Sequence, residues 1–370
     1  MPTCIALATG GTAGHVTPAL AVAEAARRRW PDARLLFLGS TGGFEARLVA
    51  AHGHAFTPLP AAPWHGVGVG GRLRAGERLV AGVAAARRAL RATGAQLVIG
   101  FGGYATAGAI VAARSLGVPA ILHEANARPG LSNRVLGRLA TRICVAWPNA
   151  AAAFPRAARV SHTGMPIRAE LAALAAERRQ PPADGRLRLL VCGGSLGSPF
   201  LNCRMPELAA ALGAAGIAVE AWHQAGARPL DDVRAAYAAA GIAARVEAHV
   251  DEMAAAYRWA DVAVACAGAA TLAEIAAAGL PAVLVPYAPA SDDHQADNAA
   301  AFAAATGAPW TRESEWNALA LAAALAPLAR DPAQWQAQSH RIHTLARPDA
   351  ADAVVSTCAE ILSAPPRSLW

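Results

Sequence analysis

The chain has 370 residues, 55% of them hydrophobic and 16% charged, and carries a formal net charge of +7 at pH 7. At roughly 150 residues per domain, this length predicts two domains, each long enough to bury a core without a disulfide or a metal. The composition excludes a disordered or fibrous chain.

The excess of positive charge is entirely arginine, because the 33 basic residues include no lysine. No zinc pattern, RNA-binding motif or basic repeat occurs, so no nucleic acid partner is expected. An anionic substrate or an anionic membrane surface would account for the charge.

The six cysteines form no CxxC pair and show no regular spacing, which favours a reducing compartment over a disulfide framework. The first residues lack the basic region of a signal peptide. The uncharged stretch 92–113 contains Gln96 and several glycines, and it favours a strand, a glycine turn and a helix over one membrane span.

Short apolar runs, glycine-rich turns and alanine-rich helical stretches alternate through the first half of the chain. A helix over roughly Pro18–Trp30 follows the first run, with Pro18 suited to its first turn. The alternation predicts an α/β fold with a parallel sheet covered on both faces. The strands expected here are Cys4–Ala8, Arg34–Leu38, Leu97–Ile99, Ala120–Leu122 and Ile143–Ala146.

The loop Gly10–His15 joins the first strand to the first helix. Its glycines would let the backbone approach a phosphate, although a tight turn without a ligand would use the same residues. Dinucleotide binding is disfavoured, since the next strand runs into Gly39 and Ser40 without the acidic residue that holds a ribose. The P-loop pattern fails for lack of a lysine. His15 is either structural or a cleft-facing acid–base group.

The segment Trp64–Arg74 mixes apolar residues with glycine, and further arginines follow at positions 78, 87, 88 and 91. Such a surface suits docking on anionic lipid, where apolar and charged contributions add. An ordinary arginine-faced helix after a loop is an equal alternative.

The pattern of strand, glycine loop and helix restarts after a polar, proline-bearing connection near 164–185, which predicts two Rossmann-type halves. The strands expected in the second half are Leu187–Cys192, Val219–Trp222, Val262–Ala265 and Ala282–Val285.

The loop Gly193-Gly194-Ser195-Leu196-Gly197 also fits the G-x-S-x-G nucleophile elbow of serine hydrolases. A hydrolase would leave the glycine loop of the first half without a role, so it is the second hypothesis. Its triad partners would come from Asp292, Asp293, His294 and His343.

The stretch Ala267–Glu274 opens a helix after a buried strand, and its small residues would let an anion approach the helix N-terminus. Glu274, about one turn in, would accept both hydroxyls of a ribose, unless it only pairs with its own helix start. The polar cluster 292–298 includes Gln295 and Asn298, whose amides suit sugar hydroxyls, but it would also pass for a solvated loop. No Asp-x-Asp triplet occurs, so a metal-bridged nucleotide-sugar site is not expected.

Taken in order, these motifs resemble the bacterial N-acetylglucosaminyltransferases that convert lipid I to lipid II in peptidoglycan synthesis, the MurG family. The resemblance covers nearly the whole chain. Its motifs are Gly10–Val16, Gly102-Gly103-Tyr104, Leu122–Asn126, Gly130–Asn133, Gly164–Arg168, Gly193-Gly194-Ser195, Trp222-His223-Gln224, Asp251–Tyr257, Gly268–Thr271 and Glu274–Pro281.

The resemblance implies a GT-B fold, with Rossmann-like domains at 1–164 and 165–341 facing across a cleft and a segment at about 342–370 packing back on the first. It implies an inverting, metal-independent transfer of GlcNAc from UDP-GlcNAc to the muramyl O4 of lipid I, without a cofactor. The enzyme would lie peripherally on the cytoplasmic face of the inner membrane, with cell-wall synthesis proteins as possible partners. Another acceptor, or a nucleotide-binding module without activity, are the remaining alternatives.

The resemblance also assigns site residues by position. The general base would be His15, with Glu124 as the second choice, and Gly103 and Tyr104 would face the acceptor. Asn126 and Gln295 would hold the donor sugar, and Val250 would meet uracil through its backbone. The substrate-binding set is Thr12, Ala13, Gly14, Asn126, Arg168, Ser195, Val250, Ala269, Ala270, Thr271, Leu272, Ala273, Glu274 and Gln295. The chain departs from the family pattern at Ala13, Ala125, Leu196 and Cys266-Ala267.

Overall fold

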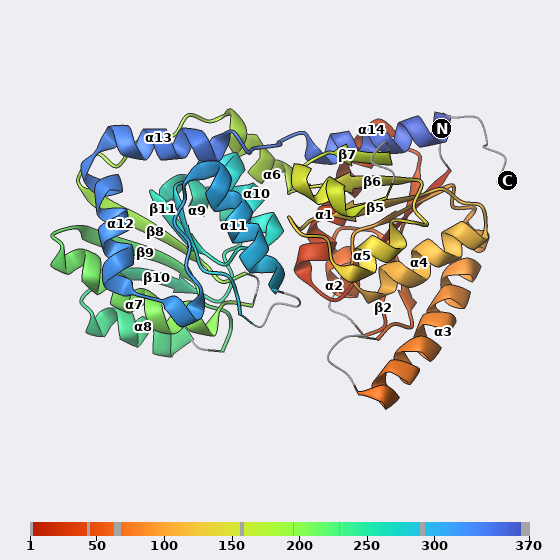
Figure 1. Cartoon of the computed structure of the whole chain (residues 1–370), viewed down its shortest axis with the longest axis horizontal. Helices are drawn as coiled ribbons and strands as arrows, with labels where there is room; N and C mark the ends of the chain where they lie inside the picture. Colours follow the sequence, from red (N-terminus) through yellow and green to blue (C-terminus); the bar gives the residue numbers. More distant parts are fainter. Residues whose placement is uncertain are drawn as a thin grey trace. The chain divides into compact units, whose positions relative to one another are not determined.

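A computed structural model describes residues 3–42, 45–62, 68–155, 159–194, 196–228, 230–288 and 293–363. The chain forms two compact units (Figure 1). Unit 1 comprises Met1–Arg168 and Asp349–Trp370, and unit 2 comprises Ala169–Pro348. In the described part of the chain, no helix is both long enough and apolar enough to span a membrane.

Unit 1 contains a parallel sheet with the strand order β3-β2-β1-β4-β5-β6-β7. Its central strands are buried along their whole length, as a sheet with both faces covered requires. The strands are β1 Cys4–Ala8, β2 Arg34–Ser40, β3 Ala55–Leu59, β4 Leu97–Gly100, β5 Ala120–Glu124, β6 Arg142–Val145 and β7 Val160–His162.

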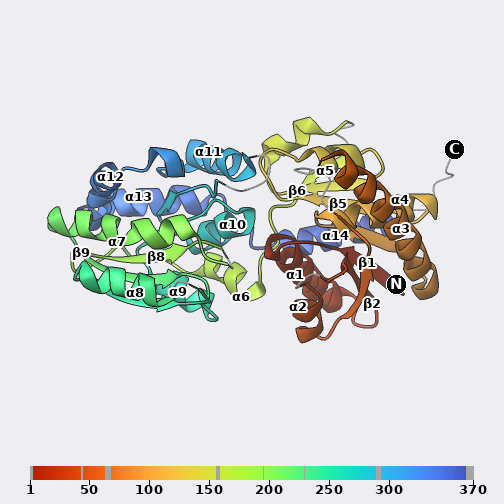
Figure 2. The same cartoon turned by 90° about the horizontal axis from the view of Figure 1, so that it is seen from below.

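Helices cover both faces of this sheet, and the alternation of β1 shows how. Ile5 and Leu7 pack with α1 and α14, whereas Ala6 and Ala8 pack with α3 and α4 on the opposite face. The helix α14 lies against α1 within the same unit (Figure 2). The helices are α1 Ala13–Arg29, α2 Glu45–Ala51, α3 Val69–Thr93, α4 Tyr104–Ser115, α5 Leu131–Leu136, the 3-10 helix Pro148–Ala153 and α14 Ala350–Ser363.

The first helix begins earlier than the sequence suggested. The N–H groups of His15 and Val16 donate to the carbonyl of Thr12, so α1 starts at Ala13 and Pro18 lies inside the helix. The expected start at Pro18 is therefore wrong. Pro18 has no N–H and so lacks one hydrogen bond within the helix. The preceding turn is nevertheless formed, because the Thr12 carbonyl accepts from His15 and Val16.

Unit 2 contains a second parallel sheet, with the order β10-β9-β8-β11-β12. The strands are β8 Arg186–Cys192, β9 Ala218–Gln224, β10 Ala243–Glu247, β11 Val262–Ala265 and β12 Ala282–Leu284. The helices are α6 Ala169–Ala172, α7 Pro199–Ala214, α8 Leu230–Ala239, α9 Met253–Trp259, α10 Ala269–Ala278, α11 His294–Thr306, α12 Ala318–Arg330 and α13 Pro332–His343, with 3-10 turns at Ala173–Ala176 and Glu313–Glu315.

Both sheets reverse their strand order beside their first strand, between β1 and β4 in unit 1 and between β8 and β11 in unit 2. In open parallel sheets, ligands bind outside the carboxyl ends of the strands at such a switch point. Loops with two glycines each, at 9–12 and 101–103, follow β1 and β4. In unit 2, Gly193 and Gly194 follow β8, and the loop 266–268, with Gly268, follows β11. The α/β fold with two Rossmann-like units is thereby confirmed.

Candidate active site

The two glycine loops of unit 1 pack directly on each other. Gly103 has φ +81°, and a Cβ at this position would lie 2.4 Å from the carbonyl oxygen of Gly10. The buried Thr106 hydroxyl donates to the carbonyls of Ala8, at 3.1 Å, and Gly102, at 2.6 Å. Only glycine at 103 allows this close approach, so the loops after β1 and β4 form one rigid structure.

His15 lies in the first turn of α1, next to these loops. Its Nδ1 is 2.7 Å from the carbonyl oxygen of Gly10 and 3.2 Å from Thr12 Oγ1. Because a carbonyl oxygen can only accept, Nδ1 carries the proton and donates to Gly10. Burial lowers the pKa of His15, more than the Gly10 carbonyl and the charge of Glu45 raise it. The ring is therefore neutral at pH 7, and Nε2 carries the lone pair that can accept a proton.

Glu124 ends β5 and is buried, with 1% of its surface exposed. Its Oε1 accepts from the backbone N–H of Asn126 at 2.8 Å and from Asn126 Nδ2 at 3.2 Å, and Oε2 accepts from Asn133 Nδ2 at 2.8 Å. Burial raises the pKa of Glu124, and these donors partly oppose the shift. The carboxylate thus fixes the loop that carries Asn126, a role different from that of His15.

The other expected residues of unit 1 lie at helix starts or at the end of the unit. Thr12 and Gly14 are exposed beside Ala13, the first residue of α1. Tyr104 begins α4 with 45% of its surface exposed, which is unusual for a large aromatic side chain and places it where a ligand can reach. Arg168 is half-buried.

In unit 2, the helix α10 begins at Ala269 directly after the loop that follows β11. The N–H groups of Ala269, Ala270 and Thr271 have no acceptor within the helix, and together with the helix dipole they suit a phosphate. Leu272 differs, because its N–H donates to the carbonyl of Gly268 and its side chain is 1% exposed. It belongs to the packed side of the helix, while Ala273 is half-buried.

Glu274 is half-buried in the second turn of α10. The hydroxyl of Tyr257, on α9, donates to Glu274 Oε2 at 3.0 Å. Burial raises the pKa of Cys192, at the end of β8, and the negative charge of Glu274 raises it further. This coupling is consistent with a carboxylate close to the switch point between β8 and β11.

Gln224, at the end of β9, ties two loops together, and sequence reasoning assigned it no role. Its Nε2 donates to the carbonyl of Gly194 at 2.7 Å, and its Oε1 accepts from the N–H of Val250 at 3.0 Å. The backbone group of Val250 left for a nucleobase is therefore its carbonyl. Ser195 lies outside the described residues.

The first turn of α11 contributes Gln295. Its Oε1 accepts from the N–H of Tyr287 at 3.0 Å. This bond orients the side-chain amide, so that its NH₂ group points away from the Tyr287 backbone. Asn298 is buried and donates to the carbonyl of Ala267 at 3.1 Å, so it supports the loop before α10.

The structure does not favour the serine hydrolase alternative, either in the partners of its expected triad acids or in the connection between β8 and α7. Asp293 is engaged by Arg312 through two contacts, of 3.2 and 2.8 Å, and Asp292 lies outside the described residues. β8 ends at Cys192 and α7 begins at Pro199, whereas a nucleophile elbow joins strand and helix by one sharp turn. Among the described residues, no group of three or more His, Cys, Asp or Glu side chains is disposed to hold a metal.

Two family models match the chain. The glycosyltransferase family 28 N-terminal domain matches residues 5–145, and the glycosyltransferase family 28 C-terminal domain matches residues 188–354. The first match lies within unit 1, and the second covers unit 2 from residue 188 onward and extends into the start of α14, which belongs to unit 1.

Full-length relatives carry one common description, UDP-N-acetylglucosamine–N-acetylmuramyl-(pentapeptide) pyrophosphoryl-undecaprenol N-acetylglucosamine transferase. The relative from Nitratidesulfovibrio vulgaris Hildenborough is 42% identical over 365 residues, covering 98% of this chain and 99% of its own. That from Acidithiobacillus ferrooxidans is 42% identical over 363 residues, covering 97% and 98%. The crystal structure of Acinetobacter baumannii MurG superposes with a TM-score of 0.79 at 29% identity, covering 97% of this chain and 100% of that one.

Proposed function

The chain belongs to glycosyltransferase family 28 and, within it, to the N-acetylglucosamine transferases of lipid II synthesis, and we propose how its own residues carry out that transfer. The enzyme is a hexosyltransferase of the GT-B type. It moves GlcNAc from UDP-GlcNAc to the muramyl O4 of lipid I in peptidoglycan synthesis.

The donor site of the proposal is the carboxyl end of the sheet in unit 2. The free N–H groups at the start of α10 take the diphosphate, Glu274 takes the ribose hydroxyls and the Val250 carbonyl takes the N3–H of uracil. Gln295 offers its NH₂ to the sugar hydroxyls. One observation carries this proposal. The start of α10 offers backbone N–H groups to a phosphate, and the Glu274 carboxylate, bonded to Tyr257, lies about one turn further along the helix.

The acceptor chemistry of the proposal lies in unit 1. As the muramyl O4 bonds to C1 of GlcNAc and the bond from C1 to the UDP oxygen breaks, Nε2 of His15 takes the hydroxyl proton. The bond from Nδ1 to the Gly10 carbonyl strengthens as the imidazolium forms. Glu124 keeps Asn126 in place, and Tyr104 and the Gly102-Gly103 turn face the acceptor.

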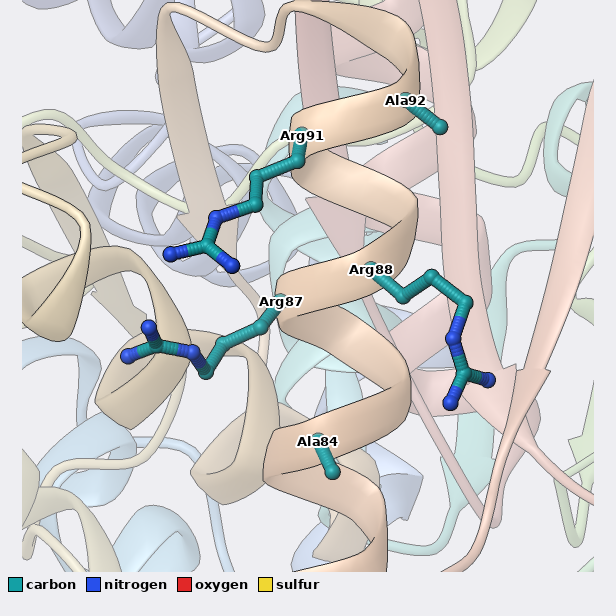
Figure 3. Close-up of a pocket in the computed structure, with 5 residues that line it drawn as sticks. All are labelled: Ala84, Arg87, Arg88, Arg91 and Ala92. Carbon is teal, nitrogen blue, oxygen red and sulfur yellow. The ribbon is translucent and has the colours of Figure 1, made fainter.

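We further propose that α3 docks the enzyme on the anionic cytoplasmic face of the inner membrane. Three arginines of this helix, Arg87, Arg88 and Arg91, line a shallow hollow, with Arg87 and Arg91 one turn apart on one side (Figure 3). Nearer the helix start, Leu73 and Val80 are 68% and 72% exposed. Apolar side chains beside arginines are the combination that holds a helix at a lipid surface. The expected apolar segment 64–67 lies outside the described residues.

The activity is tested by incubating the purified protein with UDP-GlcNAc and a lipid I analogue in the presence of EDTA. The expected result is release of UDP matched by a product heavier by one N-acetylhexosamine. UDP binding without product would redirect the proposal to another acceptor, and the absence of both would overturn it.

A further inference from the structure

A buried tyrosine hydroxyl and the carboxylate at the donor site form a hydrogen bond that the transfer reaction by itself does not explain. Tyr257 is 1% exposed near the end of α9, and its hydroxyl donates to Glu274 Oε2 at 3.0 Å. A phenylalanine would fill the same space, but the hydroxyl needs a polar partner when it is buried. The partner it finds is a half-buried carboxylate on the helix whose start suits a phosphate.

The backbone around Tyr257 is held in place by Arg179. The guanidinium of Arg179 donates to the backbone carbonyls of Tyr257, Arg258 and Ala260, which lie at the end of α9. Arg179 also stacks over the ring of Trp335, whose centroid is 6.0 Å from the guanidinium carbon. Trp335 is fully buried, and its Nε1 donates to the carbonyl of Asp261 at 2.9 Å.

The immobile partner of the pair is therefore Tyr257, and the flexible one is the glutamate. A bond to a charged acceptor is strong enough to select one orientation of a side chain with three rotatable bonds. The carboxylate has about four lone-pair positions, of which the bond to the phenol uses one.

We propose that Tyr257 is a positioning residue of the donor site, which holds the Glu274 carboxylate in the orientation that recognises the ribose of UDP. This inference rests on the proposed function, since it requires that Glu274 meets the ribose. The tyrosine touches no substrate and acts only through the glutamate.

The test measures binding of UDP and of 2′,3′-dideoxy-UDP by calorimetry, without an acceptor, to the intact protein and to Tyr257→Phe. We expect Tyr257→Phe to bind UDP about 10- to 150-fold more weakly, the range for loss of a hydrogen bond to a charged group. Its affinity for dideoxy-UDP should stay unchanged, because that ligand lacks both ribose hydroxyls. In turnover, KM for UDP-GlcNAc should rise while kcat stays within about twofold.

The chain offers a matched control. Tyr237 is also 1% exposed and lies in the same unit, but its hydroxyl oxygen is 3.0 Å from His223 Nδ1, so it is paired with a histidine ring and not with Glu274. Tyr237→Phe should leave the affinity for UDP unchanged. Glu274→Ala should lose the discrimination between the two nucleotides, and adding Tyr257→Phe to it should cause no further loss, because a positioning residue has nothing left to position.

The binding experiment distinguishes failure of the proposed function from failure of the role proposed for Tyr257. If the unmodified protein does not bind UDP, the proposed function and this inference both fail. If it binds UDP and discriminates against dideoxy-UDP, but Tyr257→Phe does the same or loses affinity equally for both ligands, only the inference is overturned. The inference is also contradicted if Tyr257→Phe lowers the affinity for UDP further in the Glu274→Ala background, so that the two losses multiply.

Discussion

The carbonyl oxygen of Gly10 lies where a side chain at Gly103 would have to begin, 2.4 Å from the position of a Cβ atom. The same oxygen accepts the hydrogen bond of His15 Nδ1. One backbone atom therefore both orients the candidate base and limits residue 103 to glycine.

Gly103→Ala should consequently disturb both stability and activity. Gly103 has φ +81° and ψ 168°, a backbone region used almost only by glycine, and this conformation should cost an alanine about 1–3 kcal/mol. The clash with Gly10 should add about 1–3 kcal/mol. Gly53→Ala is the control, because Gly53 has φ +70° but nothing within 4 Å of a Cβ. Urea unfolding should show the larger loss for Gly103→Ala, together with strongly reduced transfer. Equal losses would mean that the two loops relax apart at little cost.

Replacement of His15 should remove most of the transfer activity. We expect His15→Gln to lower kcat/KM by about 10²- to 10⁴-fold, the range for loss of a general base, with an unchanged melting temperature. His52→Gln serves as the control, since His52 is exposed and its Nδ1 lies 2.8 Å from the Leu48 carbonyl oxygen in the adjacent helix α2. Near-normal activity of His15→Gln would remove His15 from the mechanism.

The pH profile provides a second check on His15. Because burial lowers the pKa of His15 below its ordinary value of 6.5, the imidazole stays neutral and competent above that pH. The rate should be level near pH 7–8 and fall as the pH decreases, with a midpoint below 6.5. A midpoint above 6.5 would contradict the assignment.

Replacement of Glu124 should lower the rate of transfer but should not change the midpoint of its pH dependence. Glu124→Ala leaves the donors of Asn126 and Asn133 without their acceptor, which should cost about 1–3 kcal/mol of stability. Glu124→Gln should weaken transfer but keep the acidic limb of the profile at the midpoint of the unmodified enzyme. Disappearance of the limb in Glu124→Gln would instead identify Glu124 as the base.

The buried His123 should make the protein less stable in acid. Burial lowers the pKa of His123 to about 4, although the Gly164 carbonyl at 3.1 Å partly opposes the shift. The unfolded chain, with an ordinary pKa near 6.5, therefore binds the extra proton between about pH 6.5 and 4, and the free energy of unfolding falls as the pH decreases through this window. Denaturation of His123→Gln at pH 7, 6 and 5 should show a slope smaller by up to about 1.4 kcal/mol per pH unit. Parallel slopes would show that His123 has the same pKa in the folded protein as in the unfolded chain.

Membrane docking should depend on the arginines of α3. At about 1 kcal/mol for each arginine near an anionic surface, replacing Arg87, Arg88 and Arg91 by alanine should weaken binding to vesicles containing anionic lipid by roughly 100-fold. The control replaces three exposed arginines of unit 2, Arg204, Arg228 and Arg347, and changes the net charge equally. Equal effects of both triple variants would show a response to net charge alone.

The sequence predicted the inner strands best. The strands Cys4–Ala8 and Val262–Ala265 have the expected ends, because each is an unbroken apolar run next to turn residues. The strands β3, β7 and β10 were missed. They are short or partly exposed, and β3 contains Pro58, so none of them shows a continuous apolar signal.

The site was accessible to sequence reasoning only where a local motif marks it. Glycine loops and helix starts have such motifs, and these directed attention to His15 and Glu274. The supporting contacts join distant positions, since Tyr257 is 17 residues from Glu274 and Gln224 is 30 residues from Gly194. A single tyrosine or glutamine has no periodic or compositional signal, so its partner emerges only from the folded chain.

The packing of α14 on α1 sets an order for folding during synthesis. Val354, Val355 and Cys358 of α14 complete the same buried cluster as Ile5 and Leu7, yet all of unit 2 lies between them in the sequence. On the ribosome, the cluster that α1 forms on the first sheet stays incomplete until α14 is made, while unit 2, which is continuous in sequence, can assemble its own core. The half of the enzyme that is translated first is therefore the half that is finished last.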